Sequence, residues 1–428
     1  MSERYKLGLS RSRLFEFDNR VCFAAQFGQG FSVNGLDRGF KMLCEKEPLI
    51  TAVIELDADG EAFAVTHSAE QSLMRADGTA KELVLAKRRE SLDFSKRLFE
   101  FFITDDGLVI FAHTAVADVK SLFILAGELN AFAGRRLLNI EPSGVLLFSE
   151  RDELMPTLFS PLVDSVTSEL EEGWRKKKRV FGAGDYRAAA AAFEGSRRSE
   201  GLCEFTIPEE AAAAFKERCT LQKLDCSSAL CFAFYKAAKP MLHGTKKYYR
   251  ISFGTDKRLY LENESRIGVG PFSSGVTVGT PGKKNIAKLG ELKAYHDELY
   301  QKFSSAFQAF YDETFLMLLS PSFCDAAYMY AAQLYKGKYA KKLALNHTCL
   351  SPRMMSFYSY NPDTAFGQRL EGFDNIIAFE PFKTRDDIFV TALTRNGVIR
   401  LFVFYNMDKL SPEKTEEIFK KAKELLGI

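Results

Sequence analysis

The pattern of hydrophobic and polar positions is clearest between residues 98 and 130. Two apolar runs, Leu98–Ile103 and Leu108–Ala112, flank the polar turn Thr104–Gly107. Two short apolar runs around a turn that contains Gly predict a β-hairpin. The second run ends at His113, and a helix with one apolar face is predicted to begin near Ser121. We therefore expect a histidine at the end of a buried strand, shortly before a helix.

The rest of the first half predicts both helices and strands. A helix is expected over Asn34–Glu45, because Pro48 disfavours its continuation. The run Leu49–Leu56 is rich in β-branched residues, which favours a strand, and it is expected to pair in a hairpin with Ala62–Val65. Apolar residues at four-residue spacing predict a further helix over Pro156–Trp174.

The second half repeats this mixture. Cys203–Ile207 is a predicted strand, and Pro208 suits the first position of the helix that should follow it. Ile388–Thr394 and Val398–Tyr405 flank Asn396-Gly397, and Asn-Gly accepts the positive φ values of a type I′ hairpin turn. A terminal helix is predicted over Ser411–Leu426. The pattern indicates an α+β fold, and no glycine-rich phosphate loop follows a predicted strand.

The length of 428 residues suits two domains of about 200 residues each. Charges and glycines interrupt the hydrophobic pattern between Arg175 and Glu200, although Ala188–Phe193 could form a helical turn or two, and the domain boundary is expected there. We assign residues 1–180 to an N-terminal subdomain, 181–200 to a linker and 201–428 to a C-terminal subdomain.

Composition excludes several classes of protein. The chain carries 58 basic and 56 acidic residues, a balance that does not predict a nucleic-acid or anionic-membrane partner. The basic run Arg175–Arg179 has two interpretations: a solvated linker, or a contact with anions such as CoA phosphates or an acidic carrier protein. The eight cysteines show no zinc-binding spacing, so no metal is expected. With no signal core and no apolar run of membrane-spanning length, we expect a cytoplasmic protein with reduced thiols.

The segment His113–Val119 resembles a known signature. In the superfamily of condensation domains and CoA-dependent acyltransferases, which includes chloramphenicol acetyltransferase, a strand ends in His-His-x-x-x-Asp-Gly. With Asp118 in the place of the motif's Asp, the first His matches His113. The second His, which is the catalytic one, falls on Thr114, and the Gly falls on Val119. The motif is therefore degenerate at two of its four defined positions.

Other segments are similar to the same superfamily in the same order. Gly39–Ile50 looks like its early helix, Cys219–Leu230 like the start of the first long helix of the second half, and Gly268–Gly275 like a glycine-containing strand at the domain interface. The resemblance implies two similar chloramphenicol acetyltransferase-like subdomains of mostly antiparallel sheet plus helices, with a channel between them.

The resemblance also implies roles for the motif residues. The second His of the motif is the general base, and the Asp is structural because it pairs with an arginine, for which Arg13 is one candidate here. Thr114 cannot serve as that base, since a hydroxyl is a very weak base. Losing a general base costs on the order of 10² to 10⁴ in rate. His113 is expected to be fixed by a backbone hydrogen bond, or, as an alternative, to turn toward the channel and restore a base. Val119 is expected to conflict with a positive φ at the glycine position.

Two serines and the remaining histidines complete the candidates. Ser356 and Ser359 resemble residues of a strand that faces the channel in this superfamily, where they could donate hydrogen bonds to an oxyanion. The other histidines have no partner at a recognisable catalytic spacing and are expected to be structural or exposed; they are His67, His243, His296 and His347.

Two functions from different classes follow. The first is an enzyme that transfers an acyl group from a CoA or carrier-protein phosphopantetheine thioester to a small-molecule alcohol or amine. The thioester is then a co-substrate, not a bound cofactor, and an acyl-carrier protein is a candidate partner. The second is a non-catalytic protein that binds CoA, an acyl ligand or a partner on the same scaffold, because fold alone does not decide function.

Overall fold

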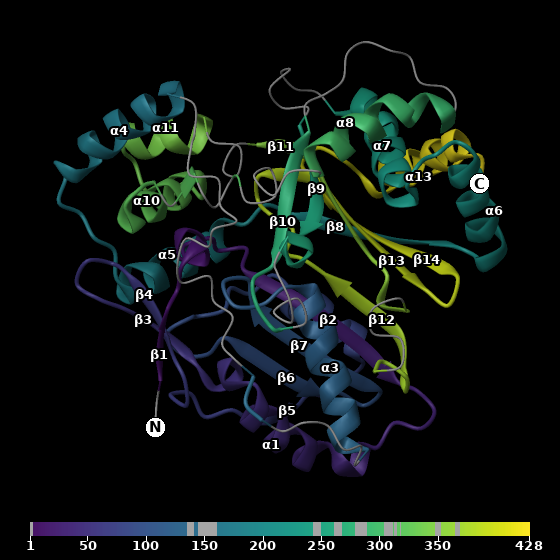
Figure 1. Cartoon of the computed structure of the whole chain (residues 1–428), viewed down its shortest axis with the longest axis horizontal. Helices are drawn as coiled ribbons and strands as arrows, with labels where there is room; N and C mark the ends of the chain where they lie inside the picture. The colour runs from purple at the N-terminus through teal and green to yellow at the C-terminus, as the bar shows by residue number, and fades with distance from the viewer. Residues whose placement is uncertain are drawn as a thin grey trace.

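Figure 1 shows the computed structural model of the chain, in which two sheets with flanking helices lie one above the other. The structure describes residues 3–134, 141–143, 161–242, 250–260, 268–278, 289–303, 311, 315–316, 318–346, 352–363 and 369–428. His243 and His347 lie outside these residues, as does the first part of the predicted helix 156–174. Among the described residues, no helix combines the length and the apolar character that crossing a membrane requires.

The first sheet is built mainly from the N-terminal half, and its strand order is β12-β2-β7-β6-β5. The strands are β2 (Arg20–Phe27), β5 (Leu73–Arg75), β6 (Phe99–Ile103), β7 (Gly107–His113) and β12 (Phe373–Phe379). The predicted hairpin of β6 and β7 is present, and β7 lies between β2 and β6 with all seven residues buried. His113 therefore ends a central strand of this sheet.

Helices and a small sheet surround the first sheet. The helices are α1 (Leu36–Lys46), α2 (Ala80–Lys87) and α3 (Val119–Ala133). The small sheet has the order β1-β4-β3, with β1 at Arg4–Lys6, β3 at Val53–Leu56 and β4 at Ala62–Val65. The predicted strand Leu49–Leu56 is shorter than expected, because Pro48 opens a 3₁₀ turn over Pro48–Thr51.

The second sheet has the order β10-β9-β11-β13-β14-β8. Its strands are β8 (Glu200–Ile207), β9 (Ile251–Asp256), β10 (Ser273–Val278), β11 (Arg353–Tyr360), β13 (Asp386–Arg395) and β14 (Val398–Asn406). The helices beside it are α6 (Glu209–Leu221), α7 (Cys226–Ala238), α8 (Lys293–Phe303) and α13 (Pro412–Leu426). Strand β11 runs parallel to both of its neighbours, whereas the other pairs of this sheet are antiparallel.

The turn between β13 and β14 has the predicted conformation. Asn396 has a φ of 49° and Gly397 a φ of 76°, and two successive positive φ values are those of a type I′ turn. The register of the hairpin runs from Arg395 opposite Val398 to Ile388 opposite Tyr405. The hairpin predicted from Asn396-Gly397 is therefore confirmed.

Segments of the second half pack on the first half. Strand β12 pairs antiparallel with β2, so the C-terminal half contributes the edge strand of the first sheet. Helices α10 (Pro321–Ala331) and α11 (Lys338–Asn346) lie beside α4 (Pro161–Arg175) in Figure 1. Buried side chains of α10 and β12 belong to the same hydrophobic core as those of β2 and β7.

The segment expected to be a linker contains a helix, α5 (Ala183–Ser196). The backbone N–H of Gly182 donates to the side chain of Asp185 at the start of this helix. Tyr186, Ala189 and Phe193 are buried on one face. Glycines near the two ends interrupt the apolar pattern without breaking the helix, since they lie where a helix tolerates them best.

Candidate functional site

A cavity of about 60 Å³ lies where the loop after β7 meets the second sheet. Thr114, Ala117 and Asp118 border it from the loop, and Ser356 and Tyr358 border it from β11. The other described residues that line it are Arg13, Glu16, Ser252, Pro271, Ser273, Gly275, Arg353, Glu380, Pro381, Lys383, Arg385, Asp386 and Phe389. Both halves of the chain therefore form its walls.

Asp118 is held by an arginine of the second half. Arg258 Nη1 donates to Asp118 Oδ2 at 2.7 Å, and Arg258 Nη2 donates to Asp118 Oδ1 at 3.0 Å. Nη2 also donates to the Ser121 hydroxyl at 2.9 Å, and the N–H of Ser121 donates to Asp118 Oδ1, so Asp118 caps α3. Burial opposes ionisation of Asp118, but Arg258 outweighs it and holds the pKa of Asp118 below its ordinary value. The partner of Asp118 is therefore Arg258, while Arg13 lines the cavity.

His113 is fully buried, and it is not among the described residues that line the cavity. Its Nδ1 accepts a hydrogen bond from the N–H of Ala115 at 3.1 Å, and its Nε2 lies 2.9 Å from Asn19 Nδ2. Burial, helped by the charge of Lys383, lowers the pKa of His113 to about 3. The ring is therefore neutral at physiological pH, and both of its nitrogens already have neighbours.

Thr114 directly follows the last residue of β7. Its N–H donates to the carbonyl of Asn19 at 2.8 Å, which ties the loop to the strand β2 side of the sheet, and its side chain borders the cavity. Val119 is the first residue of α3 and is fully buried. Its φ is not positive, so the expected conflict between a β-branched residue and a left-handed conformation does not arise.

The two candidate serines are not together. The Ser356 hydroxyl borders the cavity but donates to Asp386 Oδ2 at 2.8 Å, and Arg353 Nε donates to the other oxygen of Asp386 at 2.9 Å. Ser359 lies three residues along β11, which places it on the opposite face of the strand. Its oxygen accepts a hydrogen bond from the Ser227 hydroxyl at 2.9 Å. Only Ser356 therefore borders the cavity beside Thr114.

Glu380 was not a candidate from sequence, yet it is a buried carboxyl in the wall of this cavity, 6% exposed. Oε1 accepts hydrogen bonds from the N–H of Val119 at 3.2 Å and from the Tyr360 hydroxyl at 3.1 Å. Burial, helped by the charge of Asp118, raises the pKa of Glu380 to about 7. The sequence signal was weak: like His113, Glu380 directly follows a buried apolar strand, here Ile376–Phe379.

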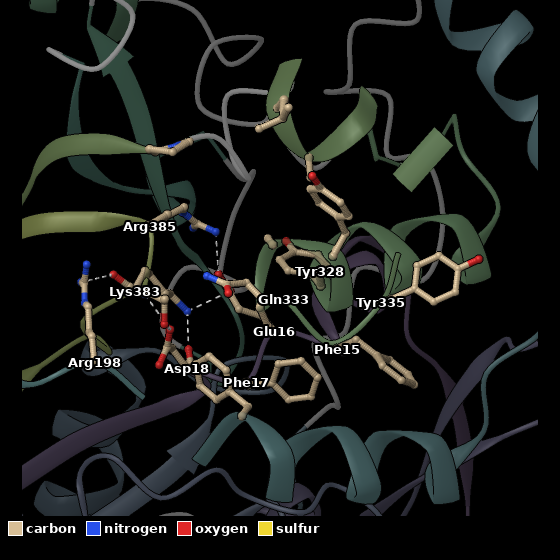
Figure 2. A pocket seen from close by; sticks show the side chains of 18 of the residues that line it. Phe15, Glu16, Phe17, Asp18, Arg198, Tyr328, Gln333, Tyr335, Lys383 and Arg385 are labelled. Carbon is tan, nitrogen blue, oxygen red and sulfur yellow. Dashed lines mark hydrogen bonds and ion pairs between the residues drawn. The ribbon is translucent and has the colours of Figure 1, made fainter. Parts of the chain in front are cut away.

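A larger cavity of about 900 Å³ lies on one side of the small one. Figure 2 shows its wall, with Phe15, Tyr328 and Tyr335 on one side and charged residues on the other. Glu16, Lys383 and Arg385 line both this cavity and the one beside Thr114.

These three shared residues form an ion-pair cluster. Glu16 accepts hydrogen bonds from Lys383 and from Arg385, both at 2.8 Å. Burial opposes ionisation of Glu16, but these two cations outweigh it and lower the pKa of Glu16 to about 2. The side chains of this cluster therefore lie between the large cavity and the small one.

A third cavity of about 410 Å³ lies against β9 and β11 and shares Asp118, Ser273 and Tyr358 with the small cavity. Tyr358 is partly buried and packs over Gly254, where a Cβ would lie only 2.2 Å from the ring. The three cavities thus adjoin in series, with the Thr114–Asp118 loop in the middle.

No protein-family model matches the chain, and neither does any curated protein sequence. Solved structures do match in shape. The condensation domain of the monacolin K polyketide synthase MokA superposes over 99% of this chain and 96% of its own, with a TM-score of 0.64 and 12% identity. The trichothecene 15-O-acetyltransferase TRI3 of Fusarium sporotrichioides superposes over 99% of this chain and 94% of its own, with a TM-score of 0.62 and 11% identity.

The chain has the condensation-domain fold. The predicted two-subdomain, mostly antiparallel α+β architecture is confirmed. The same fold occurs inside longer chains: the match to AB3403, a four-domain nonribosomal peptide synthetase, spans 100% of this chain and 33% of that one, with a TM-score of 0.62 and 11% identity.

On this condensation-domain fold, the basic run Arg175–Arg179 is exposed at the end of α4. Arg175 pairs with Glu171 at 2.9 Å and Lys176 with Glu172 at 3.0 Å. Arg179 pairs with Asp185 of α5 at 3.1 Å. Because three of its five cations contact acidic neighbours, the run carries less uncompensated charge than its sequence indicates.

Proposed function

We propose that the protein transfers an acyl group from a thioester to an alcohol or amine in the cavity beside Thr114. The observation that carries this proposal is the series of three cavities around the Thr114–Asp118 loop. The outer two, of about 900 and 410 Å³, match the size of small-molecule sites, and the inner one joins their walls. Two substrates that enter from opposite sides would meet at this loop.

The Asp118–Arg258 pair supports the proposal because it fixes the loop where the substrates would meet. Positioning two reactants converts a bimolecular step into an effectively unimolecular one, provided that the groups around them are rigid. The thioester would be CoA or carrier-bound phosphopantetheine, and the acceptor a small molecule. An acyl-carrier protein is then a candidate partner, which agrees with the likeness to a multidomain peptide synthetase.

The second candidate function is a binding protein without turnover, and Thr114 favours it. The motif's base is replaced by a hydroxyl, and His113 is held away from the cavity with a pKa of about 3. A chain with this arrangement would hold an acyl ligand or CoA in the same cavities.

An assay of thiol release distinguishes the two functions. Purified protein is mixed with acetyl-CoA or an acyl-pantetheine and a panel of alcohols and amines, and free thiol is measured beside the variant Thr114→His. Thr220→His, on the exposed face of α6, is the matched control. Acceptor-dependent thiol release by the unaltered protein supports transfer. Release only by Thr114→His supports the binding protein, and no release from any variant, with CoA raising the Tm, does the same.

A further inference from the structure

We propose that Glu380 accepts the proton of the attacking hydroxyl or amine, in the role that the second His of the superfamily motif would otherwise have. This inference rests on the proposed acyl transfer. It assigns the general base to the residue directly after β12, a strand of the C-terminal half that lies in the first sheet, and not to the segment that resembles the motif.

The position of the carboxyl supports this role. Glu380 lines the same cavity of about 60 Å³ as Thr114, so an acceptor bound there lies beside its carboxyl. The Val119 N–H at 3.2 Å and the Tyr360 hydroxyl at 3.1 Å both bond Oε1. These contacts fix the orientation of the group from two sides, as catalysis by a positioned base requires.

Both departures from the motif lie next to Glu380. Thr114 borders the same cavity as Glu380, and its side chain is smaller than an imidazole. Val119 donates its N–H to Glu380 directly. Thr114 therefore lines the same cavity as the proposed base Glu380, and Val119 contacts its carboxyl.

The charges around Glu380 suit a base that works near neutral pH. From the N-cap position of α3, Asp118 raises the pKa of Glu380, although Arg258 pairs with Asp118. From the segment after β12, Lys383 lowers it. Tyr358 and Tyr360 face it from β11, and both stay neutral because burial raises the pKa of each phenol. With burial as the largest cause, the pKa of Glu380 is raised to about 7, where a general base is most effective.

The acceptor oxygen or nitrogen attacks the thioester carbonyl carbon, a C–O or C–N bond forms, and its proton passes to the Glu380 carboxylate. The tetrahedral intermediate then collapses, the C–S bond breaks, and the proton goes from Glu380 to the leaving thiolate. No oxidant, reductant or further reactant is required.

The test compares the isosteric variant Glu380→Gln with Glu47→Gln. Glu47 is the matched control, because burial raises its pKa to about 7 as well, while it lies at the end of α1 and contacts Ser143, away from the cavity. Thiol release is measured from pH 5 to 9 with a short acyl-pantetheine. We expect Glu380→Gln to lower kcat by about 10²- to 10⁴-fold with little change in KM, and to remove the rise in kcat near pH 7. Glu47→Gln should leave both unchanged.

The outcomes separate the two proposals. If the unaltered protein releases no thiol with any acceptor, the proposed acyl transfer fails and the role of Glu380 fails with it. If the protein is active and Glu380→Gln keeps the kcat and the pH profile, only Glu380 is overturned. The infrared C=O band of a protonated carboxyl gives a readout besides activity. Because burial gives Glu47 a similar pKa, the band is compared between the two variants. A component that titrates near pH 7, remains in Glu47→Gln and is lost in Glu380→Gln supports the assignment, whereas a band that Glu380→Gln leaves unchanged overturns it.

Discussion

Arg258 contacts Asp118 through both of its terminal nitrogens, across a sequence separation of 140 residues. Both side chains are almost fully buried, and the same guanidinium also donates to the carbonyl of Gly268 at 3.0 Å. One arginine of the second half thereby fixes the loop that follows β7 in the first half. The pair joins the two halves at the point where the cavities meet.

Removing this arginine should destabilise the protein. Arg258→Met leaves the buried Asp118 carboxylate without its cation, and breaking a buried ion pair costs about 3–5 kcal/mol. Arg258→Lys should recover only part of this loss, because an ammonium cannot make the same two-point contact. Urea unfolding at pH 7 measures the free energy of unfolding.

The matched control for this prediction is Lys421→Met on α13. Lys421 pairs with Glu417, and both side chains are about half exposed, so the loss should stay below about 1 kcal/mol. Equal losses for Arg258→Met and Lys421→Met would contradict the structural role of Arg258.

Acid should weaken the ion pairs that Glu16 forms with Lys383 and Arg385. The pKa of Glu16 is about 2 in the folded protein and 4.5 ordinarily, so its contribution is present above pH 4.5 and is lost as the pH falls toward 2. The shift corresponds to about 3 kcal/mol. Glu16→Gln should therefore be less stable than the unaltered protein at pH 6, and the difference should shrink at pH 3. Urea unfolding at both pH values tests this, and a constant difference would show that Glu16 is not the titrating group.

The contribution of Glu380 to stability should change with pH in the opposite direction to that of Glu16. Its pKa is about 7 in the folded protein and 4.5 ordinarily, so its contribution to stability is fully present below pH 4.5 and is lost as the pH rises through 7. Glu380→Gln removes the buried charge. We expect the variant to have a higher Tm than the unaltered protein at pH 8.5 and a similar Tm at pH 4.5. Thermal unfolding followed by circular dichroism checks this, and a higher Tm of the unaltered protein at pH 8.5 would contradict it.

The β13–β14 turn should not tolerate a side chain at Gly397. Its φ of 76° costs an L-residue about 1–2 kcal/mol, and a Cβ would lie 2.8 Å from the Glu209 side chain. Gly397→Ala should lower the free energy of unfolding by at least about 1 kcal/mol. Gly195→Ala is the matched control, since Gly195 lies in α5 with open space around it and should gain up to about 1 kcal/mol. Urea unfolding compares the two, and a loss in both variants would argue against the turn as the cause.

Much of the fold followed from local patterns in the sequence. The Asn396-Gly397 turn, the helix start at Pro208 and the Ser411 cap of α13 each depend on residues within one or two turns of chain. The α5 helix was predicted only as a possible turn or two over Ala188–Phe193, because the glycines at 182, 184 and 195 obscured the rest of its apolar face.

The candidate site was only partly predictable. The sequence located the Thr114–Asp118 loop and the need of Asp118 for an arginine, but it could not choose Arg258 over Arg13. It also grouped Ser356 with Ser359, although successive positions on a strand face opposite ways and these two are separated by three.

The sequence by itself predicted several of the strands and helices, among them the β13–β14 hairpin and α13, and that His113 ends a buried strand shortly before a helix. Only the tertiary structure decided that His113 lies away from the cavity and that Glu380 lies within its wall. The physical reason is range, because hydrophobic periodicity and turn residues depend on a few neighbouring residues. Glu380, by contrast, contacts Val119 across 261 residues of sequence, and β12, which Glu380 directly follows, is placed by its pairing with β2. That pairing depends on how the two halves pack, which no local pattern specifies.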